Sequence, residues 1–158
     1  MKNKLVIVTG ASSGIGKACA EKFAQEGANL VLAARSADKL REVAENIARY
    51  GVQVLPVVTD VSVEEECKHL IKSAISKFGR IDVLVNNAGI SMRASFSDLD
   101  ISVLKKVMDV NFWGTVYCTR YAISSILENK GSIVGVSSIA GYKGLPGRTG
   151  YSSSKFAM

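Results

Sequence analysis

The sequence has few of the residues that build disulfide frameworks and metal sites, with three cysteines and one histidine among 158 residues. Cys19, Cys67 and Cys118 are odd in number, widely spaced and set among apolar or helical residues, so we predict reduced, buried thiols. The single histidine, His69, lies in a charged helical stretch, whereas zinc sites need several such ligands. We therefore expect neither a disulfide framework nor a metal site.

Long hydrophobic runs are also missing. The basic start of the chain, Met1 to Lys4, and the apolar run Leu5 to Val8 look like the beginning of a signal peptide, but a polar, glycine-containing segment ends the run after four residues. No run approaches the roughly 20 apolar residues of a membrane span. The sequence therefore predicts a soluble, cytoplasmic protein without a membrane span.

Charge of one sign is not concentrated anywhere along the chain. The formal net charge is +6, but lysine and arginine are spread among aspartate and glutamate rather than gathered in blocks, which argues against a nucleic-acid partner. With 47% hydrophobic residues the chain is able to bury a core of its own. Because repeats, low-complexity tracts and linkers are absent, residues 1–158 are predicted to form one domain or part of one.

Short apolar runs alternate with amphipathic helical patterns along the whole chain. This alternation is typical of a parallel β-sheet that is covered by helices on both faces. We predict an α/β fold of the Rossmann type, a doubly wound parallel sheet, with a helical segment between successive strands. The predicted strands are Leu5 to Thr9, Asn29 to Ala33, Gln53 to Val58, Asp82 to Asn86 and Ser132 to Val136.

Three helices have a recognisable apolar stripe. The clearest is predicted to begin at Ser62, with Ser62 and Glu65 in a capping box, and to end at Gly79. Its expected buried face is Val63, Cys67, Leu70, Ile71, Ala74, Ile75 and Phe78. The other two stripes are Phe23 and Ala24 before Gly27, and Leu40, Val43, Ala44 and Ile47 before Gly51.

A long helical stretch from about Ile101 to Asn129 has a surface of mixed character. It carries Trp113, Tyr117 and Tyr121. Such a surface can pack against a second subunit, or it can pack within one subunit. The sequence leaves both alternatives open.

A glycine-rich loop joins the first predicted strand to the first predicted helix. It runs from Thr9 to Gly16 and places Gly10, Gly14 and Gly16 where the backbone has to turn tightly and approach a ligand. A helix that starts in such a loop offers free amide groups and the positive end of its dipole to a pyrophosphate. We therefore predict a dinucleotide site here, with a plain glycine loop as the alternative. The remaining candidate cofactor-binding residues of the loop are Ser12, Ser13 and Ile15.

The end of the second strand bears on the choice of cofactor. A dinucleotide without a 2′-phosphate needs a carboxylate here to hold its ribose hydroxyls, and the sequence has Ala34 and Arg35 instead. The planar cation of Arg35 suits a phosphate, with help from the hydroxyls of Ser12, Ser13 and Ser36. We therefore predict NADP(H) in preference to NAD(H). If Arg35 is merely a solvated residue, the two cofactors should bind equally well.

Tyr151 and Lys155 are four residues apart and share one face of a predicted helix. A tyrosine hydroxyl has a pKa of about 10 in water and becomes a useful acid or base near neutral pH only if a nearby cation stabilises the phenolate. Ser138 lies 13 positions before Tyr151 (151 − 138), at the end of the last predicted strand. The three groups can converge on one carbonyl oxygen. The alternative is an ordinary surface tyrosine and lysine beside a serine turn.

These residues occur in an order that closely resembles the classical short-chain dehydrogenase/reductase family. The resemblance rests on the glycine loop, the run Asn86-Asn87-Ala88-Gly89, and Asn111, Ser138, Tyr151 and Lys155, and it covers nearly the whole chain. It implies that the loop cradles the pyrophosphate of the cofactor and that Asp60 and Val61 lie by the adenine. It also implies that Asn87, Ala88 and Gly89 line the adenosine ribose, while Asn86 ties neighbouring strands together.

The same resemblance implies a mechanism. Tyr151 would protonate a carbonyl oxygen while the nicotinamide delivers a hydride, and oxidation of a secondary alcohol would run the same steps backward. Lys155 would lower the pKa of the phenol and hold the nicotinamide ribose. Ser138 would donate a hydrogen bond to the substrate oxygen, with Ser137 as its rival for this role, and Asn111 would position a water in a proton relay.

Members of the family usually have roughly 250 residues, the upper range for one α/β domain. The resemblance implies that the rest of the helix carrying Tyr151, two further strands and a segment that closes over the substrate should follow. We therefore expect an incomplete domain in which Ser132 to Val136 is an unpaired edge, and a homo-oligomer for the full-length protein. Two functions stay open: a hydride-transferring oxidoreductase, or a fragment that binds the cofactor without turnover. Residues expected to border the substrate, without selecting one, are Ser91, Met92, Arg93, Ala140, Tyr142, Leu145 and Pro146.

Overall fold

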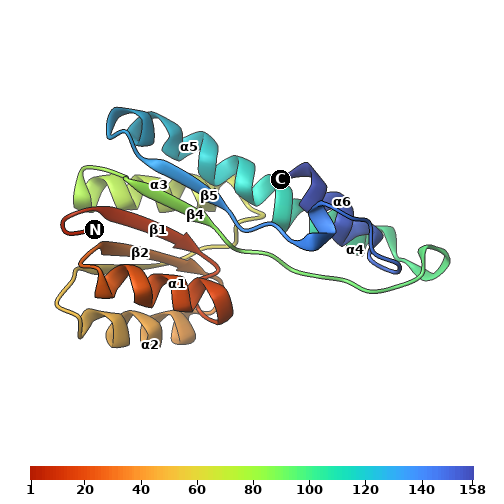
Figure 1. Ribbon diagram of the computed structural model, residues 1–158, viewed down its shortest axis with the longest axis horizontal. Coiled ribbons are helices and arrows are strands. Elements are labelled where there is room, and N and C mark those ends of the chain that lie inside the picture. Colours follow the sequence, from red (N-terminus) through yellow and green to blue (C-terminus); the bar gives the residue numbers. More distant parts are fainter.

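The computed structural model describes residues 1–158 and confirms the predicted α/β architecture. The strands are β1 (Leu5–Thr9), β2 (Asn29–Ala34), β3 (Val54–Val58), β4 (Val83–Asn86) and β5 (Ser132–Gly135). All of them are parallel, and they form one sheet in the order β3-β2-β1-β4-β5 (Figure 1). The chain therefore changes its direction across the sheet after β3, and the carboxyl ends of β1 and β4 flank the switch point where such sheets bind ligands.

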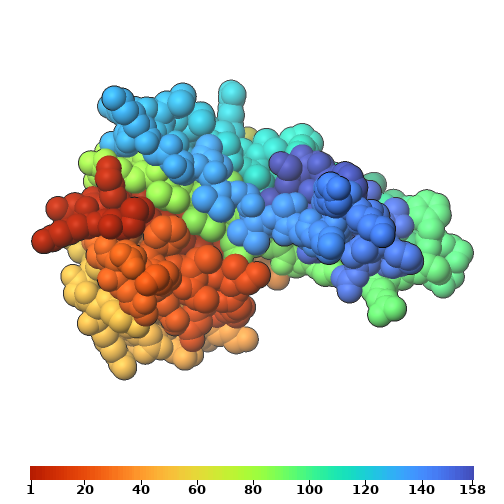
Figure 2. All heavy atoms as spheres, viewed as in Figure 1, coloured from red at the N-terminus to blue at the C-terminus, as the bar shows by residue number.

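Helices cover both faces of the sheet, as expected. One face carries α1 (Gly14–Gln25) and α2 (Ala37–Ala48), and the other carries α3 (Glu64–Phe78) and α5 (Gly114–Glu128) (Figure 1). Two further helices, α4 (Ile101–Met108) and α6 (Thr149–Ala157), pack against each other beyond the carboxyl ends of the strands. Figure 2 shows this part as a narrower extension beside the main body.

Alternate residues of the central strand point to opposite faces. Leu5 and Ile7 of β1 belong to the core beneath α3 and α5, whereas Val6 and Val8 belong to the core beneath α1 and α2. Each side chain of this kind contributes about 1.5–3 kcal/mol to folding when it is fully buried. Because helices cover both faces of the sheet, the sequence of β1 is a continuous apolar run. β1 is therefore a firm support for the glycine loop that follows it.

The start of α3 differs from the sequence prediction. The helix begins at Glu64 with Val63 as its N-cap residue, and no side chain caps it. Ser62 precedes the N-cap residue and forms no capping box; its amide (3.0 Å) and its hydroxyl (2.7 Å) both donate to the carboxylate of Asp60. Glu65 pairs instead with Lys68. Gly79 does end the helix, with a positive φ of 71°.

Two residues of the expected α3 stripe lie at the surface. Cys67, Leu70, Ile71 and Ala74 are buried, but Val63 is 44% exposed and Ile75 is 41% exposed. Val63 precedes the first helical turn, and Ile75 lies at the margin of the stripe. The stripe of α2 is buried as expected at Leu40, Val43, Ala44 and Ile47. Cys67 and Cys118 are buried free thiols, whereas Cys19 is only partly buried.

The long helical stretch from Ile101 is interrupted by one π-helical turn, Asp109–Trp113, between α4 and α5. Tyr117 and Tyr121 are partly buried against the core of their own subunit, and the Tyr121 hydroxyl donates to Glu64 at 2.7 Å. Trp113 is 43% exposed. The two tyrosines thus follow the alternative of packing within one subunit. None of the helices combines the length and the apolar character that crossing a bilayer requires.

The two edge strands of the sheet are unlike each other. β3 carries Pro56 in its middle, and proline has no amide hydrogen to offer to another strand. β5 is the expected open edge: all four of its residues are exposed, including the apolar Ile133 and Val134, and none is charged or proline. Only the β5 edge is therefore able to accept a further strand along its whole length.

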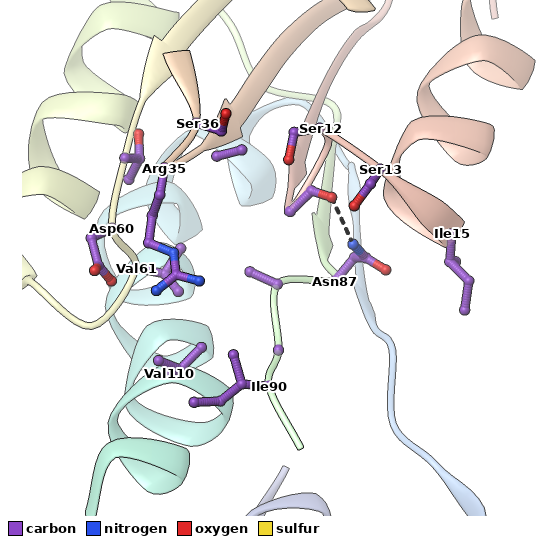
Figure 3. Close-up of a pocket in the computed structure, with 15 residues that line it drawn as sticks. Ser12, Ser13, Ile15, Arg35, Ser36, Asp60, Val61, Asn87, Ile90 and Val110 are labelled. Carbon is purple, nitrogen blue, oxygen red and sulfur yellow. Dashed lines mark hydrogen bonds between the residues drawn. The ribbon is translucent and has the colours of Figure 1, made fainter. Parts of the chain in front are cut away.

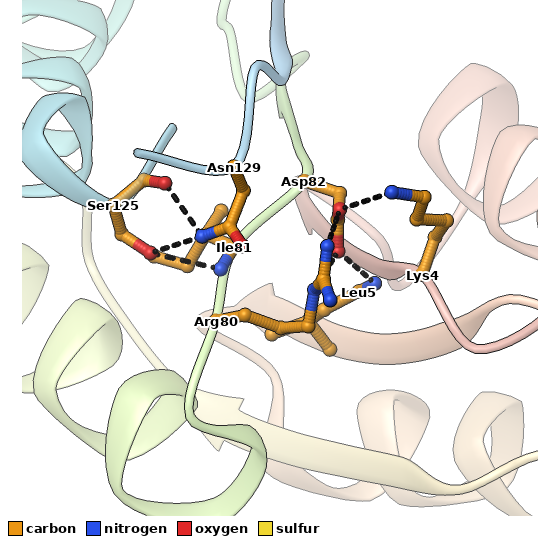
Figure 4. Close-up of polar contacts among 7 residues, drawn as sticks. All are labelled: Lys4, Leu5, Arg80, Ile81, Asp82, Ser125 and Asn129. Carbon is orange, nitrogen blue, oxygen red and sulfur yellow. Dashed lines mark hydrogen bonds and ion pairs between the residues drawn. The ribbon is translucent and has the colours of Figure 1, made fainter. Parts of the chain in front are cut away.

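Asp82 gathers polar groups at the amino ends of β1 and β4 (Figure 4). Its side chain is 4% exposed and accepts hydrogen bonds from Lys4 (3.0 Å), the Leu5 amide (2.9 Å) and the guanidinium of Arg80 (2.8 and 2.6 Å). Burial acts to raise the pKa of Asp82, but these bonds outweigh it and lower the pKa to about 2. The cluster joins the two central strands at the end opposite the glycine loop.

Candidate active site

A cavity of about 400 Å³ opens at the carboxyl ends of β1, β2 and β4 (Figure 3). It contains most of the residues that the sequence assigns to the cofactor. On one side lie the glycine loop and the start of α1, and on the other lie Arg35 and the segment that follows β3 (Figure 3). The predicted cofactor residues that line it are Gly10, Ser12, Ser13, Ile15, Arg35, Asp60, Val61, Asn87, Ala88 and Gly89. Gly14 and Gly16, and Tyr151 and Lys155, do not line this cavity.

The three glycines of the loop have different tasks. Gly10 has a φ of +66°, and a Cβ there would meet the Asn87 amide nitrogen at 2.8 Å. Gly14 has a φ of +54° but faces open space, so only its backbone conformation demands glycine. A Cβ on Gly16 would collide with the carbonyl oxygen of Gly10. The loop therefore combines two left-handed turns with a close approach of α1 to the end of β1.

The first turn of α1 suits an anion. Ser13 is the N-cap residue, but its side chain makes no capping hydrogen bond, and the first turn contains no acidic residue. The amides of this turn and the positive end of the helix dipole are therefore free to bind a negative group. Together with the open space at Gly14, this donor set fits the pyrophosphate of a dinucleotide.

Thr9 fixes the loop to β4, a role that the sequence analysis did not assign. Its hydroxyl oxygen accepts bonds from the amides of Asn87 and Ala88, both at 3.0 Å, and donates to the carbonyl of Val85. The Asn87 side chain returns a bond to the Thr9 carbonyl at 2.9 Å and reaches the Gly10 carbonyl at 3.4 Å (Figure 3). These bonds set the width of the cavity between the two strands.

The far side of the cavity carries one positive and one negative side chain, Arg35 and Asp60. The guanidinium of Arg35 lies near Asp60 and Val61 (Figure 3) and takes part in no salt bridge. Burial acts to raise the pKa of Asp60, but hydrogen bonds from Ser62 and the charge of Arg35 hold it below its ordinary value. Ala34 and Ser36 line the cavity beside Arg35. Arg35 is thus a positive group directed at the cavity with no carboxylate bonded to it.

Tyr151 and Lys155 lie on α6, next to this cavity. The ammonium of Lys155 is 6.0 Å from the centroid of the Tyr151 ring and donates to the Val136 carbonyl at 2.8 Å. Lys155 is only 6% exposed, and this burial lowers its pKa. A Cβ on Gly89, which lines the cavity, would lie 3.6 Å from the Lys155 nitrogen. Lys155 therefore connects the tyrosine to the edge of the cavity.

Ser138 and its neighbour Ser137 have different partners. The Ser137 hydroxyl donates to the carbonyl of Lys155 at 3.2 Å and so holds α6 in place. The Ser138 oxygen accepts a bond from the amide of Ala140 at 3.2 Å, which leaves its hydrogen available. Of the two serines, only Ser138 keeps a hydroxyl hydrogen to donate.

Asn111 lies within the π-helical turn and is fully buried. Its side chain accepts from the amide of Ile90 (2.8 Å) and donates to the carbonyl of Ile90 and to the hydroxyl of Ser154 (both 2.9 Å). Ser154 in turn donates to the carbonyl of Tyr151. Asn111 thus joins the exit of β4 to α6, and its expected water-positioning role stays a prediction.

Asn86 has a different partner from the one expected. Its side-chain nitrogen donates to the hydroxyl of Thr119 on α5 at 3.1 Å, so it ties a strand to a helix rather than to a neighbouring strand. Its side-chain oxygen is buried without a hydrogen-bond partner.

Comparison with known proteins agrees with this geometry. A family model described as short chain dehydrogenase matches residues 4–158. The chain belongs to the short-chain dehydrogenase family. Among curated members, it is 44% identical to the 11-beta-hydroxysteroid dehydrogenase-like 4A of Arabidopsis thaliana over 100% of its own length and 54% of the relative. It is also 44% identical to the 11-beta-hydroxysteroid dehydrogenase A of Arachis hypogaea, over 98% of its own length and 45% of the relative.

Solved structures of the family share the fold. An alcohol dehydrogenase from the archaeon Thermococcus sibiricus, complexed with 5-hydroxy-NADP, has a TM-score of 0.95 and 32% identity over 98% of this chain and 66% of that one. An NAD⁺-bound xylitol dehydrogenase has a TM-score of 0.95 and 31% identity over 99% of this chain and 61% of that one. The chain therefore spans about half the length of the curated relatives it matches and about two thirds of these solved chains.

Several residues of the site were not predicted from the sequence. Ile90, Thr59 and Val110 line the cavity, and Thr9 and Ser154 hold its neighbours in place. Ile90 directly follows the Asn-Asn-Ala-Gly run, and this position in the sequence could have indicated it. Thr9 and Ser154 gave no signal, because their partners are 78 and 43 residues away in the sequence.

Proposed function

We propose that the protein to which this chain belongs is an NADP(H)-dependent oxidoreductase that interconverts a carbonyl compound and a secondary alcohol. The bound dinucleotide would supply or accept the hydride. Tyr151 would give a proton to the carbonyl oxygen during reduction and take it back during oxidation. The observation that carries the proposal is the buried ammonium of Lys155 between Tyr151 and the dinucleotide cavity.

Lys155 supports this role through its position. A positive charge beside the phenol would stabilise the negative charge that develops on its oxygen as the proton is transferred. Its distance from Gly89 also allows the ammonium to donate to a ribose hydroxyl at the edge of the cavity. Ser138, whose hydroxyl hydrogen is free, would donate a second hydrogen bond to the substrate oxygen. Ser137 is a poorer candidate because its hydroxyl binds α6.

The preference for NADP(H) rests on Arg35. Its guanidinium faces the cavity where the adenosine ribose would lie, and Ser36 adds a hydroxyl beside it. The position holds no carboxylate that could bind both hydroxyls of an unphosphorylated ribose. Asp60 is the only acidic residue that lines the cavity, and hydrogen bonds from Ser62 engage it.

Reduction of carbonyl compounds, followed by the loss of NADPH absorbance, tests the proposal. We expect turnover by the wild-type protein and a loss of at least about 100-fold in kcat for Tyr151→Phe, since general acid catalysis contributes about 10²–10⁴. Tyr50→Phe is the matched control, because this tyrosine is 50% exposed and follows α2, away from α6. Full activity of Tyr151→Phe would contradict the proposed role.

A second candidate function is binding of the dinucleotide without turnover. This is the alternative that the sequence left open, and the comparisons do not favour it, since the relatives and solved structures reported above are named as dehydrogenases. A fluorescence titration with NADPH and NADH, using Trp113, separates the candidates. Saturable binding without reduction of any carbonyl compound indicates the second function, and binding with reduction indicates the first.

A further inference from the structure

Three of the segments around Tyr151 lack acidic residues. Residues 83–97, residues 129–158 and α4, which packs on α6, contain no aspartate or glutamate, whereas the π-helical turn that also contacts α6 begins with Asp109. They do contain Arg93, Lys130, Lys143, Arg148 and Lys155. Asp98 and Asp100, the acids that follow the first segment, accept hydrogen bonds from Ser95 and Ser97 and from Ser102. A region with charges of one sign attracts ligands of the opposite sign.

Arg148 is, with Lys155, one of two basic residues that lie against the Tyr151 ring. Its guanidinium carbon lies 5.8 Å from the centroid of the Tyr151 ring, and the guanidinium donates to the hydroxyl of Ser91. Ser91 is neutral and exposed, and no carboxylate forms a salt bridge with Arg148. The strongest anion-binding side chain in this region is thus left with a weak, replaceable partner.

The backbone fixes the position of Arg148. The amide of Ala94 donates to the carbonyl of Gly147 at 2.9 Å, and Gly147 has a φ of +69°, a conformation that favours glycine. These features hold the residue before Arg148 against the segment that carries Ser91. The backbone that carries Arg148 is therefore held beside Ser91, which its guanidinium reaches.

The charge of Arg148 is not needed for the dinucleotide. Arg148 does not line the 400 Å³ cavity, where Arg35 and the start of α1 offer positive groups to phosphates. It directly follows Leu145 to Gly147 in the sequence, and Leu145 and Pro146 are expected to border the substrate. A substrate whose carbonyl oxygen reaches Tyr151 therefore comes near the guanidinium, which lies 5.8 Å from the centre of the Tyr151 ring.

We propose that Arg148 is a specificity-determining residue that binds a carboxylate or another anionic group of the substrate, so that the preferred substrates are anionic carbonyl compounds such as keto acids. The anionic group replaces the Ser91 hydroxyl as the partner of the guanidinium and sets the direction in which the carbonyl meets Tyr151. This inference rests on the proposed function, since it assigns the substrate class of the same site.

Paired ligands that differ only in charge test the inference. Para-acetylbenzoate and para-acetylbenzamide have nearly the same shape, and at neutral pH only the first is anionic. Their dissociation constants, measured by calorimetry on the NADP⁺-saturated protein, do not depend on turnover. We expect the acid to bind at least about tenfold more tightly than the amide, the gain typical of a charge-assisted hydrogen bond. The preference should shrink as the salt concentration rises.

Three variants test whether the preference for the acid depends on Arg148. Arg148→Met should bring the acid-to-amide ratio close to one, whereas Ser91→Ala should keep the ratio, because it removes only the neutral partner. Arg49→Met is the control, since Arg49 is an exposed residue at the end of α2. Equal binding of acid and amide by the wild-type protein, or an unchanged ratio in Arg148→Met, would overturn the inference. A normal acid preference without reduction of either ligand would leave it standing and count against the proposed function alone.

Discussion

The ammonium of Lys155 lies 6.0 Å from the centre of the Tyr151 ring, on the same face of α6. The four-residue interval in the sequence produces this relationship directly, because residues so spaced are neighbours on a helix. The depth of Lys155 comes from the tertiary structure, in which Val136 at the end of β5 accepts its hydrogen bond. The charge is therefore desolvated, and burial lowers the pKa of Lys155.

Lys155→Met should separate activity from stability. We expect a loss of at least about 100-fold in turnover, since the proposed proton transfer from Tyr151 loses the cation beside it. Because a lowered pKa means that the folded state disfavours the charged amine, the wild-type lysine weakens folding below its folded-state pKa and ceases to do so as the pH rises above it. Urea unfolding of Lys155→Met at neutral pH should consequently show unchanged or increased stability. A large loss of stability together with normal turnover would contradict both expectations.

Asp82→Asn should destabilise the fold without touching the site. A pKa of about 2, against an ordinary value of 3.8, corresponds to about 2 kcal/mol of stability. This contribution is complete above pH 4 and is lost as the pH falls through about 2, where the carboxylate of the folded protein takes up a proton. Urea unfolding should show the full difference at pH 7 and a smaller one at about pH 2. Asp38→Asn, at an exposed pair with Arg41, should change stability by less than about 0.5 kcal/mol.

Arg35→Gln should change the choice of cofactor. Loss of the guanidinium removes a charge-assisted hydrogen bond to the 2′-phosphate, so NADPH should bind about 10- to 100-fold more weakly, and NADH should be little affected. Fluorescence titrations with both dinucleotides measure the ratio. If wild-type protein binds the two equally, Arg35 is a solvated residue and the predicted preference is wrong.

Gly14→Ala and Gly16→Ala should reduce the stability of the fold by different amounts. The space beside Gly14 is open and only its φ of +54° is unfavourable, so the alanine should reduce stability by about 1 kcal/mol. A methyl group on Gly16 meets the backbone of Gly10, which has to move, so we expect a loss of about 1–3 kcal/mol and weaker NADPH binding. Urea unfolding and NADPH titration test the order. Equal losses of stability in the two variants would contradict this order, because they would show that the backbone of Gly10 moves aside at little cost in free energy.

Thr9→Val should leave two amides without an acceptor. The hydroxyl of Thr9 is bonded by the amides of Asn87 and Ala88, and valine has the same shape but no oxygen. We expect a loss of about 2–3 kcal/mol, as for buried groups that lose their partner. Thr59→Val is the comparison, because its hydroxyl only donates to the Val57 carbonyl, and its cost should be smaller.

Features that depend on neighbouring residues could be predicted from the sequence. The strands differ from their predicted bounds by at most one residue at either end, because apolar runs such as Leu5 to Val8 record burial on both faces. The glycine loop could be assigned because its chemistry lies within one turn. The capping role of Ser62 was wrong because α3 begins one residue later, with Val63 as its N-cap residue, and Ser62 belongs to the turn in which it donates to Asp60.

Features that depend on distant residues could not be predicted. Asn111 meets Ile90 and Ser154, which are 21 and 43 residues away, so the pattern around Asn111 gives no sign of either partner. The same holds for Arg148, whose contact with Ser91 spans 57 residues. Such contacts follow from the strand order, which brings the ends of β4 and β5 together.

The two edges of the sheet differ in whether they can bind a further strand. Amides of Ser132 and Val136 bind the carbonyls of Asp82 and Asn86, so by alternation the amides of Ile133 and Gly135 face outward. At the other edge Pro56 interrupts the row of donors. A strand from any source can therefore extend the sheet only beside β5, and it would end next to Val136, the residue whose carbonyl accepts the hydrogen bond of Lys155.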